Sequence, residues 1–78
     1  MAKARKFTSL KAAQDWLTKR GFAQTATQHV WQNGSRMAAI NAELGGVMPN
    51  FLVAMGDSNS DPYWARVAVV AARRAAQS

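Results

Sequence analysis

The chain has 78 residues, with ten basic and four acidic side chains that give a net charge of +6 at pH 7. This length is typical of one small domain, and the absence of cysteine excludes disulfides and thiolate zinc sites. His29 is the single histidine, so an imidazole-rich metal site is excluded and we expect no metal and no cofactor. No stretch is apolar enough to span a membrane and no signal peptide is evident, which predicts a cytoplasmic protein.

Residues 1–7 are predicted to form a flexible basic arm. Thr8 or Ser9 is a good N-cap for a helix over about residues 9–20, because a side-chain oxygen can accept from the free N–H groups of a first turn. Gly21 supplies the left-handed residue that ends such a helix. The apolar stripe of this helix consists of Leu10, Ala13 and Leu17.

Three predicted strands follow, over residues 25–32, 35–44 and 47–55. The Asn33-Gly34 pair between the first two is a strong hairpin signal, because both residues tolerate a positive φ. Pro49 lacks the N–H that a central strand needs, so the third strand is expected at an edge of the sheet.

The last predicted element is a helix over about residues 62–76. Asp61 is expected to cap it, with Pro62 at its first position, where proline is favoured. Residues 8–78 are therefore predicted to form one α+β domain of the order αβββα. In this domain, two helices pack on one face of a three-stranded antiparallel meander.

Side-chain alternation divides the predicted sheet into two faces. The more apolar face includes Trp31, Ile40 and Val53, and we expect both helices to cover it. The other face would then expose an apolar stripe that can mark a partner surface. The stripe consists of Val30, Met37, Leu52 and Met48. Antiparallel sheets also tolerate a few apolar residues on the solvent side, which is the alternative interpretation.

Basic residues gather at both ends of the chain. Residues 1–20 hold six basic residues against one acid, and residues 63–78 hold three arginines and no acid. If both helices lie side by side on the sheet, these groups form one positive surface suited to phosphates. The predicted nucleic-acid-binding residues are Lys3, Arg5, Lys6, Lys11, Lys19, Arg20, Arg36, Arg66, Arg73 and Arg74. A solvated helix face that keeps the protein soluble is the alternative.

Catalytic and metal-binding patterns are incomplete. An Asp-x-Asn-x-Asp pattern at residues 57–61 resembles the start of a calcium loop, but Pro62 and Ala68 occupy the positions that need glycine and glutamate. His29 has no carboxylate placed to orient it as a base. We therefore predict no enzymatic activity. Trp16, Trp31 and Trp64 are each expected to be core residues instead of binding platforms. For Trp31, expected near the hairpin turn and opposite Arg36, a cation–π contact or the stacking of a base is the alternative.

The αβββα order resembles that of the double-stranded RNA-binding domain and of messenger RNA interferases of the HicA type. The resemblance covers most of the chain and is one of topology. The second helix opens with Asp61-Pro62-Tyr63-Trp64, where the RNA-binding family has lysines. Gly21-Phe22 matches the end of a helix in the interferases, but Arg36 stands where their histidine would follow Gly34-Ser35. Membership of neither family is predicted.

Two functions remain open at this point. The first is a non-enzymatic module that binds DNA or RNA through phosphate contacts from the arm and the helix faces. The second is a protein-interaction module, such as an accessory or inhibitor protein of a phage or mobile element, that binds a host protein through the exposed sheet face. A homodimer through that face or through the third-strand edge is compatible with either function.

Overall fold

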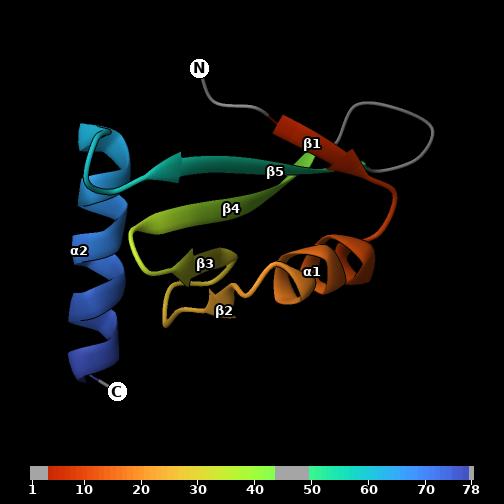
Figure 1. Ribbon diagram of the computed structural model, residues 1–78. Coiled ribbons are helices and arrows are strands. Elements are labelled where there is room, and N and C mark those ends of the chain that lie inside the picture. The colour runs from red at the N-terminus through yellow and green to blue at the C-terminus, as the bar shows by residue number, and fades with distance from the viewer. Residues whose placement is uncertain (1–3, 44–49, 78) are drawn as a thin grey trace.

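The computed structural model describes residues 4–43 and 50–77 (Figure 1). It is an α+β fold with a five-stranded antiparallel sheet and two helices. The elements in chain order are β1 (Ala4–Phe7), α1 (Leu10–Lys19), β2 (Ala23–Gln24), β3 (Val30–Asn33), β4 (Arg36–Glu43), β5 (Asn50–Asp57) and α2 (Pro62–Gln77).

The sheet has the order β1-β5-β4-β3-β2, and every neighbouring pair is antiparallel. The predicted meander is present as β3, β4 and β5, with one further strand at each side. The segment predicted as one strand over 25–32 instead holds a turn between the short β2 and β3. Since β5 lies between β1 and β4, the prediction that the third strand is an edge is wrong. Pro49 itself lies outside the described residues.

Strand β1 comes from the segment that was expected to be a flexible arm. It pairs with β5 from Ala4, opposite Ala54, to Phe7, opposite Phe51. Its four residues include one large apolar side chain, so the period-two pattern of a strand is too weak to identify it. The pairing satisfies backbone donors and acceptors along β5 that would otherwise form an open edge.

The two helices cover opposite faces of the sheet, which contradicts the prediction that both share one face. Figure 1 shows α1 lying along one side of the strands, while α2 crosses the sheet at the end where β5 leads into it. We call the two sides of the sheet the α1 face and the α2 face. The physical reason is that both faces offer apolar side chains, so each can bury the apolar stripe of one helix.

Each face has its own small core. The buried residues of the α1 face are Ala13, Leu17, Phe22, Trp31, Ala38, Ile40 and Val53. The buried residues of the α2 face are Val30, Met37 and Trp64, with Val67 and Ala68 packed beside them. The assignment of strand residues to two faces was therefore correct for the described residues. The prediction was wrong in leaving the face with Val30 and Met37 uncovered, because α2 covers it.

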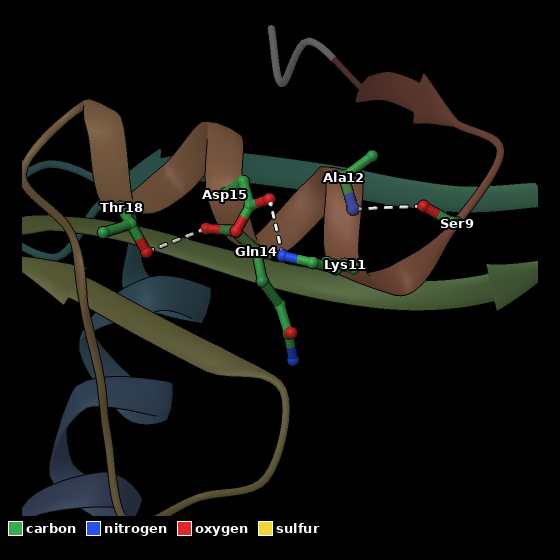
Figure 2. A network of polar contacts seen from close by, with 6 residues as sticks. All are labelled: Ser9, Lys11, Ala12, Gln14, Asp15 and Thr18. Atoms are coloured by element: carbon green, nitrogen blue, oxygen red, sulfur yellow. Dashed lines mark hydrogen bonds and ion pairs between the residues drawn. The ribbon is translucent and has the colours of Figure 1, made fainter.

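The predicted ends of both helices are confirmed. The Ser9 hydroxyl accepts a hydrogen bond of 3.1 Å from the Ala12 N–H at the start of α1 (Figure 2). Gly21 follows the C-cap with a φ of 86°, as a left-handed helix stop requires. At α2, the Asp61 carboxylate accepts from the Tyr63 N–H at 3.0 Å, which satisfies a first-turn donor.

The hairpin register differs from the predicted one by two residues. Trp31 pairs with Ala38 instead of Arg36, because Asn33 already pairs with Arg36 and the turn lies one residue later. Two-residue turns would likewise place Ile40 opposite Phe51, whereas Ile40 pairs with Val53. Since side chains alternate with a period of two, this shift leaves every residue on its predicted face.

His29 carries a backbone strain that can be tested. Its φ of 67° lies in the left-handed region, which costs an L-residue with a Cβ about 1 kcal/mol. We expect His29→Gly to raise the free energy of unfolding in urea by roughly 0.5–1 kcal/mol, after the entropy cost of glycine is subtracted. The neighbouring Gln28→Gly is the control and should lower it. An equal loss in both variants would contradict the strain.

Candidate nucleic-acid interface

Two arginines approach the indole of Trp16 on the α1 face. The Arg20 Cζ lies 4.4 Å from the Trp16 ring centroid, and the Arg5 Cζ lies 5.2 Å from it. Phe7 completes the group, with its centroid 5.7 Å from that of Trp16 and 5.8 Å from the Arg5 Cζ. All three distances between a guanidinium and a ring are within the range of a cation–π contact. We call Arg5, Phe7, Trp16 and Arg20 the Trp16 cluster.

Three elements bring this cluster together. Arg5 and Phe7 alternate with Lys6 along β1, so both face the α1 side of the sheet. Trp16 lies on the flank of α1, where it is half-buried, and Arg20 is the C-cap of the same helix. The pairing of β1 with β5 therefore determines that the Arg5 guanidinium reaches the helix.

The arginines of the cluster have no carboxylate partner among the described residues. The ion pair found there joins the Lys11 Nζ to an Asp15 carboxylate oxygen at 3.3 Å, one helical turn apart (Figure 2). The i,i+4 spacing of the sequence also predicts a pair of Asp15 with Lys19, whereas the structure pairs Asp15 with Lys11. Lys19 is exposed, follows Trp16 by three residues and forms no ion pair among the described residues, so it is a third unpaired cation close to Trp16.

The other predicted basic residues lie elsewhere, so they do not form one continuous surface with the cluster. Lys6 belongs to the α2 face, since it alternates with Arg5. Arg36 lies at the start of β4, opposite Asp57 on the neighbouring strand β5. Arg66, Arg73 and Arg74 are exposed on α2, on the opposite side of the sheet from α1. Lys3 lies outside the described residues. The expected convergence fails because it required both helices on one face.

The predicted partner-binding stripe is largely covered. Met37 is fully buried and Val30 is buried, both beneath α2 and in contact with Trp64. Leu52 is partly exposed, and Met48 lies outside the described residues. The prediction that these side chains form an uncovered apolar surface is therefore wrong for Val30 and Met37.

Trp31 is a core residue, as expected, and the alternative that it serves as a stacking platform is wrong. It is buried, it faces α1, and it pairs with Ala38. The cation–π contacts belong to Trp16, which the sequence assigned to the core. Trp16 and Arg20 are four residues apart, a spacing that makes two residues neighbours on a helix surface, and this spacing could have predicted their contact. No pattern in the residues next to Arg5 predicted its contact with Trp16.

The acidic loop forms a turn, and neither it nor His29 is part of a metal-binding group among the described residues. The Asp57 carboxylate accepts from the Asn59 N–H at 2.8 Å and from the Ser35 hydroxyl at 3.4 Å, so it organises the turn before α2. No group of three or more histidine, aspartate or glutamate side chains in residues 4–43 and 50–77 is arranged to hold a metal ion. A groove of about 490 Å³ between β2 and α2 is lined mainly by alanines, and no charged side chain lines it.

The comparisons with known proteins add no family. No protein-family model, no curated protein and no solved structure matches this chain. Within the described part of the chain, neither helix has the length and apolar character needed to cross a lipid bilayer. A function for this chain must therefore be inferred from the geometry and the charge of its own residues.

Proposed function

We propose that this chain is a non-enzymatic module that binds nucleic acid through phosphate contacts, and that the Trp16 cluster is its principal contact site. The observation that supports this proposal is the pair of guanidiniums held against one indole with no carboxylate partner among the described residues. Cations that serve folding alone are ordinarily paired with acids or spread apart, because like charges side by side repel.

The cluster suits phosphate recognition for a physical reason. A guanidinium offers its N–H donors at the edge of a plane, and stacking on an aromatic ring occupies the face and leaves that edge free. An arginine already held against Trp16 also loses less side-chain entropy on binding than a free one. Two such forks near each other can contact successive phosphates, and Lys19 adds a third cation nearby.

Contacts of this kind carry little sequence information, because phosphates are the same at every step of the polymer. We therefore expect binding that depends strongly on salt and weakly on base sequence. The net charge of +6 supports the same proposal, since it favours encounter with polyanions.

The test compares two variants that each remove two positive charges. Arg5→Gln with Arg20→Gln should weaken binding to labelled DNA or RNA by about tenfold and reduce the slope of log K against log[salt] by roughly 2 for a duplex. Lys11→Gln with Arg36→Gln is the matched control and should weaken it by about threefold or less, because both residues lie near acids. The measurement is fluorescence anisotropy with single-stranded and duplex probes at several ionic strengths.

Two outcomes would contradict the proposal. If the unaltered protein binds none of the probes at low salt, the nucleic-acid function is wrong. If the two double variants lose affinity equally, the Trp16 cluster is not the contact site. Circular dichroism before the titration checks that both variants are folded, which is expected because the altered side chains contribute through exposed contacts.

A further inference from the structure

A shallow groove runs between α2 and the turn that joins β2 to β3, on the side of the sheet opposite the Trp16 cluster. Its volume is about 270 Å³. Its lining consists of Thr27, Val30, Tyr63, Arg66, Val67 and Val70, and we call it the α2 groove. None of these residues belongs to the Trp16 cluster, so the groove is a separate feature of the molecule.

Exposed apolar side chains form one wall of the α2 groove. Tyr63 is 62% exposed and Val70 is 39% exposed, although both are large hydrophobic side chains. They are seven residues apart on α2, which places them on the same side of the helix. Covering such side chains by an apolar group of a partner removes them from water and is favourable.

Arginines surround this apolar wall. Arg66 lines the groove, and Arg73 and Arg74 follow Val70 by three and four residues, on the next turn of the same side. No acidic side chain occurs in α2, and none of the three arginines forms an ion pair within the described part of the chain. A partner whose carboxylates flank an aliphatic side chain would complement both the apolar wall and the positive rim.

We infer that the α2 groove docks a segment of another protein in which aliphatic side chains are interspersed with carboxylates, such as an acidic amphipathic helix. An aliphatic side chain of that segment packs against Tyr63, Val67 and Val70, while its carboxylates pair with Arg66 and with Arg73 or Arg74. This is the helix-in-groove mode of recognition, with apolar anchors for affinity and charge for specificity.

Two other occupants fit less well. A second copy of this chain would bring the same arginines of two molecules together, each molecule carrying a net charge of +6. A nucleic acid would satisfy the arginines, but its hydrated phosphates would leave the valines of the groove without an apolar partner. The favoured occupant is the one whose chemistry matches both parts of the surface.

The test uses two synthetic peptides of about 14 residues, or four helical turns, with leucines at the same helical spacing. At the charged positions between the leucines, one peptide carries glutamate and the other carries lysine. In amide NMR titrations of the full chain, the Leu/Glu peptide should shift the signals of Tyr63, Arg66 and Val70. The Leu/Lys peptide should bind at least about tenfold more weakly, because it opposes the arginines.

Neighbouring valines on α2 provide a matched control. Val70→Ser should weaken binding of the Leu/Glu peptide by about fivefold or more, since it removes an apolar side chain that the peptide contacts. Val69→Ser changes the next residue, which is 50% exposed but points about 100° away around the helix, and it should leave binding unchanged. The variant Arg5→Gln with Arg20→Gln should also bind the peptide normally, since it alters the other side of the sheet.

The inference is overturned by any of three results. The first is no shift of the α2 groove signals at millimolar Leu/Glu peptide. The second is equal affinity for the Leu/Glu and Leu/Lys peptides, or an equal loss of affinity for the Leu/Glu peptide in Val69→Ser and Val70→Ser. The third is displacement of the peptide from α2 by duplex DNA with the same α2 signals shifted, which would assign this surface to nucleic acid.

Discussion

Met37→Asp is expected to unfold the domain. Met37 is fully buried on the α2 face, where it contacts Trp64 and neighbouring apolar side chains. A carboxylate at this position would be buried without a partner, which costs more than about 4 kcal/mol and belongs to the most destabilising class of substitution. The whole free energy of unfolding of a domain of this size is roughly 4–12 kcal/mol, so little or none remains.

The measurement is urea or thermal unfolding followed by circular dichroism. Asn41→Asp is the matched control, because it adds the same charge on the same strand and the same face of the sheet at an exposed position. It should change the free energy of unfolding by about 0.5 kcal/mol or less. If Met37→Asp instead unfolds cooperatively at the original midpoint, Met37 is not beneath α2 and the face would be open to a partner, as the sequence had suggested.

Gly56→Ala is expected to disturb the docking of α2. A Cβ added to Gly56 would overlap the indole of Trp64, which is itself only 3% exposed. Overpacking of this kind usually costs 1–3 kcal/mol, and we expect about 2–3 kcal/mol here because the helix must shift with its ring. The φ of Gly56 is not in the left-handed region, so its backbone conformation does not require glycine. Glycine is needed here because the ring of Trp64 approaches the β5 backbone closely.

A double-mutant cycle separates this contact from a general loss of strand stability. Trp64→Leu alone removes a buried aromatic ring and should cost about 2–4 kcal/mol. In the Gly56→Ala background it should cost at least about 1 kcal/mol less, because the smaller side chain makes room for the new methyl group. Strict additivity of the two free-energy changes would show that the overlap with Trp64 is not the cause.

The candidate site could be predicted from sequence in part. The excess of lysine and arginine in the first 20 residues was enough to include Arg5, Lys19 and Arg20 among the candidates, because charge is a property of composition. Their grouping could not be predicted. Arg5 reaches Trp16 because β1 pairs with β5, a contact between segments separated by about half of the chain. Four residues with one large apolar side chain give too weak a pattern to show such a pairing.

The features that the sequence determined by itself are those controlled by neighbouring residues. The helix caps at Ser9 and Asp61, the left-handed stop at Gly21 and the division of strand residues into two faces all depend on interactions within a few positions. Tertiary structure alone decided that α2 covers Val30 and Met37 on the face opposite α1. Both faces of this sheet are apolar enough to bury a helix, so local patterns cannot select between them. The choice depends on a long-range fit, in which Gly56 leaves the space that the ring of Trp64 occupies.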